Sequence, residues 1–405
     1  MIFQTLDDKT ECVGIYTDGN LYFDRAEFPQ NLTATWAYTP HVPADDIEYA
    51  SLYLEGSLIE DNIPEYLRDD WEDANKRITA FKRSLTTAQV NMNENCFFDL
   101  VPPRFLSDWC EIKNQITQHI LKNLPRPKRY DFYKHVCILL ADISTHKVHL
   151  DKRYLSSFSS DTKLANHAKN ILNSDLLVKY NQFGTKTGRL TTKKGSLPIL
   201  TMPQAFRKAI IPQNDFYVEI DFNGAEVRTL LGMLDKPQPT GDIHQFHLDN
   251  VFTTLSSRAE SKEAFFAWLY GSKKTTSTKQ LAQLDDYYQK DTVLKTYYKD
   301  GSVITPYGKV INNVTPHHAL NYIIQSTTAE LCLKQFLKVD YFLSRSQGSR
   351  VAFLIHDALV LDMKKEDINL LEGILKLMRS TNYGNFPVNI KKGKNLGDMS
   401  SWTKL

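Results

Sequence analysis

Two aspartates stand at the ends of predicted strands, where they could hold metal ions together. Asp221 lies near the end of an apolar run, 217–222, that is typical of a strand. Asp357 lies between two apolar runs within 351–362, which predicts a hairpin with this acid at its turn. If the strands are neighbours, the carboxylates could share Mg²⁺ ions about 3.5–4 Å apart, as in two-metal phosphoryl transfer. Locally, Asp221 could equally cap the helix predicted to begin near Ala225.

A predicted helix between these aspartates carries two cations and two aromatic rings on one stripe. Arg258, Lys262, Phe266 and Tyr270 follow one another at four-residue intervals, and Gly271 is a typical helix stop. Such a stripe could hold a polyanion at one end and stack a flat ring at the other, as a nucleoside triphosphate requires. Taken alone, the stretch is more typical of a surface helix with solvated cations and buried rings, and the rest of the chain must decide between the two interpretations.

Further polar residues surround these segments in the sequence. Arg189 lies in a loop punctuated by glycine, 181–190, and His244 follows Asp242 just before the striped helix. Asn321 and Gln325 stand four residues apart on an otherwise apolar helix, where unpaired amides are costly. These amides therefore predict a binding partner for that helix.

The composition limits the class of protein. The chain has 405 residues with 42% apolar content, which is enough for two or three domains. No apolar run is long enough to span a membrane, and the five scattered cysteines indicate buried thiols in a reducing compartment. The net charge of +2 predicts no general affinity for nucleic acid. Local basic clusters could contact phosphate or simply be solvated; they lie at 122–129, 193–194, 273–274 and 391–394.

The elements that must position these residues follow from periodicity. Short β-type runs alternate with turns up to about residue 60, and 61–90 is helical and charged, which together predict a small α/β unit. Helices are expected at 105–124 and 131–143, with a domain boundary near residue 128 after the proline segment. After the second of these helices, a polar stretch extends to about residue 175.

Five of these segments, in this order, resemble the successive motifs of family A DNA polymerases, which are DNA polymerase I-like. The resemblance covers about residues 180–400 and rests on Thr187-Gly-Arg189, Asp221-Phe-Asn-Gly-Ala-Glu226-Val-Arg228, the striped helix 258–271, Asn321-x3-Gln325 and His356-Asp357. It implies an α+β, multi-domain, right-hand polymerase fold with an antiparallel palm sheet, helical fingers and a short thumb. The sequence Asn-Tyr-x-x-Gln-Ser-Thr-Thr, which begins at Asn321, resembles compact bacteriophage members of the family more than cellular repair enzymes.

The resemblance also implies roles for individual residues. Asp221 and Asp357 would hold two Mg²⁺ ions, for which Mn²⁺ could substitute. Arg258, Lys262 and His244 would grip the triphosphate, and Lys262 would protonate the leaving pyrophosphate. Contacts to the incoming nucleotide's base and sugar would come from Phe266, Tyr270 and Glu226, of which the last two exclude a 2′-hydroxyl. The DNA-binding residues would be Arg189, Asn321, Gln325, Gly271 and His356.

Several positions depart from the family pattern. Ala358 stands where a glutamate usually follows His-Asp, His317 replaces an arginine, and Phe222 replaces a tyrosine. In the N-terminal part, Asn95-Cys-Phe-Phe-Asp99 resembles the second motif of a 3′→5′ exonuclease, but no Asp-x-Glu lies at the expected distance upstream. We therefore predict a degenerate, inactive exonuclease-like region.

The expected organisation is an exonuclease-like region (1–128), a shortened thumb (129–180), palm (181–250), fingers (251–316) and a second part of the palm (317–405). The expected function is template-directed DNA synthesis from primer-template DNA and deoxynucleoside triphosphates, in viral DNA replication and in the host cytoplasm. A short thumb makes fewer phosphate contacts, which predicts low processivity and a helper protein, for processivity or for exonuclease activity. Two alternatives are a single-subunit RNA polymerase and a non-catalytic DNA-binding subunit. Glu226 argues against the first, and the two retained aspartates argue against the second.

Overall fold

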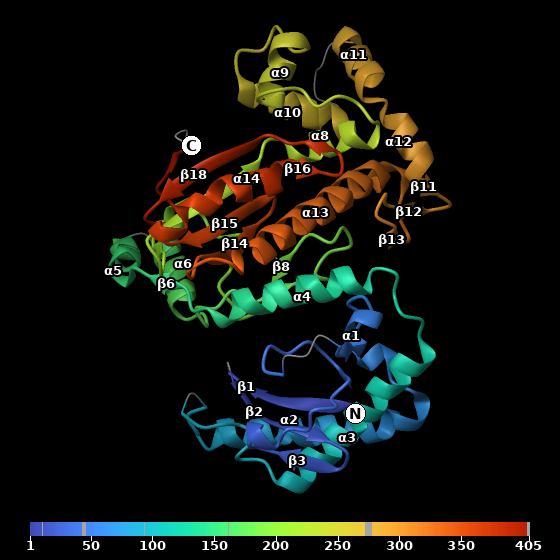
Figure 1. The fold of residues 1–405 in the computed structure, drawn as a ribbon, viewed down its shortest axis with the longest axis vertical. Helices are drawn as coiled ribbons and strands as arrows, with labels where there is room; N and C mark the ends of the chain where they lie inside the picture. Colours follow the sequence, from blue (N-terminus) through green and yellow to red (C-terminus); the bar gives the residue numbers. More distant parts are fainter. Residues whose placement is uncertain (10, 43–45, 93, 161, 272–277, 403–405) are drawn as a thin grey trace. The chain divides into compact units, whose positions relative to one another are not determined.

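The computed structural model describes residues 1–9, 11–42, 46–92, 94–160, 162–271 and 278–402, which form two compact units, Met1–Thr145 and His146–Leu405 (Figure 1). The expected boundary lay near residue 128, whereas the units divide after helix α4 (Tyr130–Thr145). The physical reason is that α4 packs on the first unit: Tyr130 is buried, and its hydroxyl accepts a 2.8 Å hydrogen bond from the backbone N–H of Tyr49.

The first unit combines a small mixed sheet with helices. Strands β1 (Phe3–Asp8), β2 (Glu11–Thr17) and β3 (Asn20–Tyr22) pair antiparallel in the order β1-β2-β3. A parallel bridge joins Ile2 to β4 (Ala34–Thr35), which pairs parallel with β5 (Glu48–Tyr49). The helices are α1 (Ala50–Tyr53), α2 (Arg68–Thr87), α3 (Pro103–Asn123) and α4.

Helix α3 was predicted from its apolar spacing and forms one wall of this unit's core. Phe105, Leu106 and Cys110 are buried against Leu6 and Tyr16 of the sheet. The small α/β unit expected from the first 90 residues is therefore confirmed as local structure.

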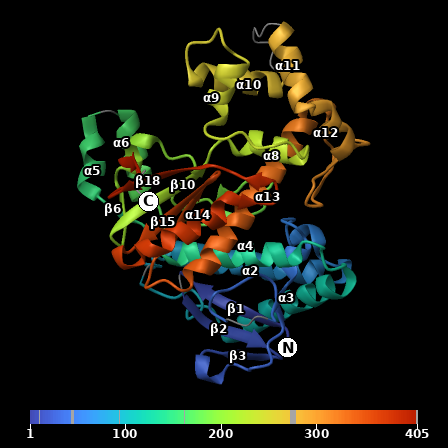
Figure 2. The same cartoon turned by 45° about the horizontal axis from the view of Figure 1, so that its top comes forward.

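The second unit is built on an antiparallel sheet of five strands in the order β14-β15-β10-β18-β19. These strands are β10 (Phe216–Phe222), β14 (Arg350–Ile355), β15 (Ala358–Met363), β18 (Val388–Gly393) and β19 (Met399–Ser401). The predicted strand and the predicted hairpin are confirmed, and they are direct neighbours because β10 pairs with β15. Helices α13 (Pro316–Leu343) and α14 (Leu371–Arg379) pack on each other and on this sheet (Figure 2).

A helical subdomain extends from one end of the sheet (Figure 1). It comprises α8 (Ala225–Met233), α9 (Ile243–Asn250), α10 (Arg258–Leu269), α11 (Thr278–Tyr288), α12 (Lys290–Tyr297) and a small sheet, β11 (Tyr298–Lys299), β12 (Ser302–Ile304) and β13 (Val310–Ile311). One apolar core joins it to the start of α13, with Phe265, Trp268, Tyr288 and Ile323 among its buried members.

Short elements complete the second unit. The stretch before residue 175, which the sequence marks only as polar, contains α5 (Lys152–Ser156), a 3-10 turn and α6 (Thr162–Leu172). Short strands and one short helix lie around and after this stretch: β6 (His149–Leu150), β7 (Tyr180–Asn181), β8 (Thr191–Thr192), α7 (Gln204–Arg207) and β9 (Ile210–Ile211). A two-stranded hairpin, β16 (Ser380–Thr381) and β17 (Gly384–Asn385), lies between α14 and β18. Within the part of the chain that the structure describes, no helix is both long and apolar enough to cross a membrane.

Candidate active site

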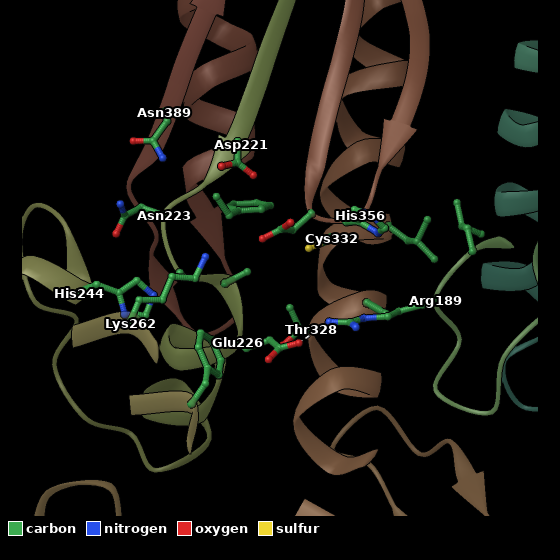
Figure 3. A pocket seen from close by; sticks show the side chains of 18 of the residues that line it. Arg189, Asp221, Asn223, Glu226, His244, Lys262, Thr328, Cys332, His356 and Asn389 are labelled. Carbon is green, nitrogen blue, oxygen red and sulfur yellow. Dashed lines mark hydrogen bonds and ion pairs between the residues drawn. The ribbon is translucent and has the colours of Figure 1, made fainter. Parts of the chain in front are cut away.

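A cavity of about 340 Å³ opens where the sheet meets the helical subdomain, and most of the predicted site residues line it. Figure 3 shows side chains from β10, α8, α9, α10, α13 and the β14–β15 turn converging on this space. Predicted site residues in its lining are Arg189, Asp221, Glu226, His244, Arg258, Lys262, Phe266, His356 and Asp357. Residues far apart in the sequence are thus brought into one site.

The two predicted metal ligands come from adjacent strands. Asp221 pairs in register with Ala358, so Asp357, the residue before Ala358, lies at the same end of the sheet. The alternative role of Asp221 as a helix cap is wrong, because the N-cap residue of α8 is Gly224 and no side chain caps this helix. His356 has a left-handed backbone (φ 57°), which turns the chain sharply between β14 and β15.

Burial disfavours the ionised form of both carboxyl groups, and at Asp221 the charge of Asp357 adds to this effect. Burial and the nearby charge of Asp357 raise the pKa of Asp221 to about 7, although a hydrogen bond from Asn389 opposes the shift. Burial also raises the pKa of Asp357. Two carboxylates that repel each other in a cavity create a strong demand for a cation, so these residues fit a hard divalent metal ion.

The protein ligands to such a metal would be few. Glu219, two residues before Asp221, is 2.6 Å from Lys391 and is neutralised there. The described residues contain no group of three or more His, Cys, Asp and Glu side chains arranged to hold a metal. Asp221 and Asp357 would therefore share the ion with water and substrate oxygens, as is usual for Mg²⁺.

Helix α10 presents the predicted stripe to the cavity. Ser257 caps its first turn, and Gly271 follows its end with φ 73°, a left-handed conformation that favours glycine. Arg258, Lys262 and Phe266 line the cavity, and Tyr270 stacks on Phe266 with ring centroids 5.9 Å apart and planes at 15°. The predicted residues therefore follow one face of α10 and its C-cap, and the function of this face stays a prediction.

The cationic end of the stripe is held by α9. Arg258 donates a 2.7 Å hydrogen bond to Asp242, which also caps α9 and accepts a 2.7 Å bond from Asn223. His244, in the first turn of α9, is buried, and burial together with the charge of Lys262 lowers its pKa to about 4. His244 is therefore a neutral imidazole at pH 7.

Glu226 stands at the other end of the stripe between two donors. The hydroxyl of Tyr270 donates a 2.5 Å hydrogen bond to one carboxylate oxygen, and Arg189 forms an ion pair with the other. The Glu226 side chain is 14% exposed, whereas that of Arg189 is half exposed. Glu226 and Tyr270, to which the resemblance assigns a joint exclusion of the 2′-hydroxyl, are thus in direct contact, and their role stays a prediction.

The remaining predicted DNA-binding residues lie outside the cavity lining. Gln325 hydrogen-bonds Tyr270, and Gly271 lies near His317. The side-chain oxygen of Asn321 is buried and has no hydrogen-bond partner in the described parts of the chain. A residue that binds a ligand is expected to have an unsatisfied polar group when the ligand is absent.

Some lining residues were not predicted from the sequence. Asn389 supports Asp221 from β18, and Thr328 and Cys332 face the cavity from α13. Arg228 appears in the polymerase-like motif without an assigned role. It is fully buried and donates hydrogen bonds to Asn223, Pro239 and Gly241, which shape the loop before α9.

The basic cluster at 391–394 has structural partners. Lys391 pairs with Glu219, Lys392 lies 3.8 Å from the ring centroid of Phe216, and Lys394 donates to a backbone carbonyl. The cluster at 273–274 lies outside the described residues. The charges of Lys391 and Lys394 are therefore paired within the protein.

Comparisons with known proteins agree with this picture. No protein-family model matches the chain. DNA polymerase I of Borreliella burgdorferi is 23% identical over 289 residues, which cover 58% of this chain and 31% of that protein. The chain thus matches less than a third of that relative's length.

A solved structure provides the comparison of folds. The polymerase domain of Pol1 from M. smegmatis, in complex with DNA primer-template and dNTP, superposes with a TM-score of 0.60 at 14% identity. The match covers 73% of this chain and 76% of that one. The predicted α+β polymerase fold with an antiparallel sheet is confirmed. The chain therefore resembles family A DNA polymerases in sequence and has the fold of their polymerase domain.

Proposed function

We propose that the protein is a DNA-directed DNA polymerase, which adds deoxynucleoside triphosphates to the 3′ end of a primer. Two similarities support this: one to a DNA polymerase I, and one to a polymerase domain whose solved complex contains primer-template DNA and dNTP. The observation that carries the proposal lies in the chain itself. Asp221 and Asp357, a carboxylate pair, share one cavity with Arg258 and Lys262, which suit a triphosphate.

In the proposed chemistry, the residues that line the cavity have different roles. Asp221 and Asp357 would hold two divalent ions, Mg²⁺ or Mn²⁺, which would activate the attacking hydroxyl and neutralise charge on the leaving pyrophosphate. Arg258 and Lys262 would bind the triphosphate, and Lys262 would give a proton to the departing pyrophosphate. Neutral His244 would add a hydrogen-bond donor without adding a charge.

The aromatic end of the site would select the nucleotide. Phe266 would pack against the incoming base and sugar, because it lines the cavity and its ring is supported by Tyr270. Glu226, held by Tyr270, would occupy the space that a 2′-hydroxyl needs. Arg189, Asn321 and Gln325 would reach the minor groove of the primer end, where acceptors occur in every base pair. Gly271 and His356 would contact the template and the primer strand.

Primer extension with Mg²⁺ tests the proposal. The wild type should extend a primed template, while Asp221→Asn and Asp357→Asn should each lose extension by several orders of magnitude, because a neutral amide binds the ion poorly. Asp249→Asn is a matched control, since Asp249 is exposed on α9 outside the cavity. An inert wild type would instead favour a non-catalytic DNA-binding subunit.

The choice of sugar separates this function from that of an RNA polymerase. The Glu226–Tyr270 hydrogen bond favours a DNA polymerase, because a buried carboxylate there crowds a ribose. Equal incorporation rates for ribonucleotides and deoxynucleotides by the wild type would reverse the assignment.

For the N-terminal unit we propose an exonuclease-like remnant without activity. Gln4, the second residue of β1, donates to Asn114 and Thr117 of α3 at 3.0 and 3.1 Å, so this strand carries a buried amide network. Asp99, from the segment that resembles an exonuclease motif, is exposed. Nucleotide release from a mismatched primer that disappears on Asp99→Ala would contradict this proposal.

We further propose a role in viral DNA replication with help from a second protein. Among the described residues of the second unit, the helices that precede the Arg189 loop are α5, a 3-10 turn and α6, all of them short, which leaves few groups to grip product duplex. The isolated chain should therefore release DNA after short extensions when a trap prevents rebinding. Long products under those conditions would argue against a helper.

A further inference from the structure

Thr328 is a buried polar residue of the cavity that the proposed chemistry does not use. It lies on α13, is 4% exposed, and lines the cavity together with Arg189 and Glu226. Its hydroxyl oxygen is buried and has no hydrogen-bond partner among the residues that the structure describes. A buried hydroxyl without a partner costs free energy, so a partner in another state of the site would account for its presence.

The neighbouring threonine shows that the helix could have satisfied this hydroxyl itself. Thr327 donates a 2.6 Å hydrogen bond to the carbonyl of Ile323, four residues earlier, which is the usual solution for a threonine inside a helix. Thr328 makes no such bond and faces the cavity instead. The difference between adjacent residues of one helix points to a ligand or partner on the cavity side.

Glu226 is the group that would need this hydroxyl. In the unliganded site, one oxygen of Glu226 is held by Tyr270 and the other by Arg189. Under the proposed function Arg189 turns to the minor groove of the primer end, and Glu226 then loses its cation. The Glu226 side chain is only 14% exposed, so the freed oxygen would be poorly hydrated without a new donor.

We propose that Thr328 is a positioning residue for sugar selection: when DNA draws Arg189 away, the Thr328 hydroxyl donates to Glu226 and keeps the carboxylate in the space of a ribose 2′-hydroxyl. This inference rests on the proposed DNA polymerase function. It adds a third donor, from α13, to the two that hold Glu226 in the unliganded site.

The test is the discrimination ratio, kcat/KM for a deoxynucleotide divided by kcat/KM for the matching ribonucleotide, on one primed template. Thr328→Val, which keeps the shape and removes the hydroxyl, should lower the ratio about tenfold, the lower end of what loss of a hydrogen bond to a charged group produces. Thr328→Ser should retain the wild-type ratio. Thr327→Val is the matched control and should leave the ratio unchanged, because its hydroxyl serves only the helix.

A double-mutant cycle identifies the partner. In a Glu226→Ala background, which lacks the carboxylate, Thr328→Val should have no further effect on the ratio. An active wild type whose ratio is unaffected by Thr328→Val, or a loss equal for both nucleotides, would overturn the inference and leave the proposed function intact. A wild-type chain that does not extend primers would overturn both.

Discussion

The hydroxyl of Tyr270 lies 2.5 Å from a carboxylate oxygen of Glu226, and this bond joins α10 to α8 across the cavity. Burial and the Glu226 charge raise the pKa of Tyr270, so the phenol stays protonated and always donates. With Arg189 on the other oxygen, the carboxylate is fixed from two sides. A carboxylate held in this way can exclude another group from the space it occupies.

The first prediction separates the effect of the volume of the Glu226 side chain from the effect of its charge. Glu226→Ala should raise ribonucleotide incorporation relative to deoxynucleotide incorporation by about a hundredfold or less, the range that a pocket gains from excluding one small group. Glu226→Gln keeps the volume and an acceptor for Tyr270, so it should retain most of the selectivity. Single-nucleotide insertion kinetics measure both ratios. Equal ratios for the wild type and the alanine variant would show that Glu226 does not face the sugar.

The second prediction concerns Lys262, an exposed cation of the cavity wall. Lys262→Ala should lower kcat by about a hundredfold or more, as expected when a general acid and a phosphate contact are lost together. Affinity for primer-template DNA should stay near the wild-type value, because the lysine binds only when a triphosphate is present. Lys295→Ala, at an exposed position on α12, is the control and should leave both quantities unchanged. Full turnover in Lys262→Ala would remove this residue from the site.

Much of the candidate site could be predicted because its residues stand in recognisable local sequence patterns. Asp221 ends an apolar strand, and Asp357 occupies a hairpin turn; both contexts are visible within a few residues. The four-residue spacing on α10 likewise places its residues on one face of a helix, and this holds for any arrangement of the other elements. Which strands neighbour one another was only a supposition until β10 was found between β15 and β18.

Other features depend on contacts between distant segments and leave no local pattern. Asn389 reaches Asp221 only because β18 pairs with β10, and nothing in the sequence around residue 389 indicates a site. Thr327 and Thr328 are indistinguishable in the sequence, yet one bonds its own helix and the other faces the cavity. The partners of the basic run at 391–394 are also distant in the sequence, because Lys391 pairs with Glu219 and Lys394 with the backbone carbonyl of Asp215.

The third prediction uses the ring of Phe266. Phe266→Tyr should increase the use of dideoxynucleotides relative to deoxynucleotides, because a phenol hydroxyl can replace the interaction that the missing 3′-hydroxyl would make. The stack on Tyr270 should survive, since the ring itself is unchanged. Chain-termination assays with mixed nucleotides give the ratio directly. Phe246→Tyr, on α9 outside the cavity lining, serves as the comparison and should show wild-type termination.

The fourth prediction concerns the pH dependence of stability, which reports on the buried histidines of α9. Burial lowers the pKa of His244 to about 4 and that of His247 to about 3. Below the ordinary pKa of 6.5 the unfolded chain binds a proton at each histidine while the folded chain does not, so stability falls as the pH falls. Each histidine can contribute at most about 1.4 kcal/mol per pH unit between its two pKa values.

Asp221 acts in the opposite direction, so the histidine effect must be isolated by comparison. Its pKa is raised to about 7 from 3.8, so in metal-free protein the folded state binds the extra proton between these values and gains stability as the pH falls. His244→Gln keeps this contribution but removes one histidine. In urea unfolding with EDTA at pH 7, 6 and 5, the free energy of unfolding of the wild type, minus that of His244→Gln, should therefore decrease steadily toward acid pH. Parallel curves for the two proteins would mean that His244 has the same pKa in the folded and unfolded states, which would contradict the lowering of its pKa by burial.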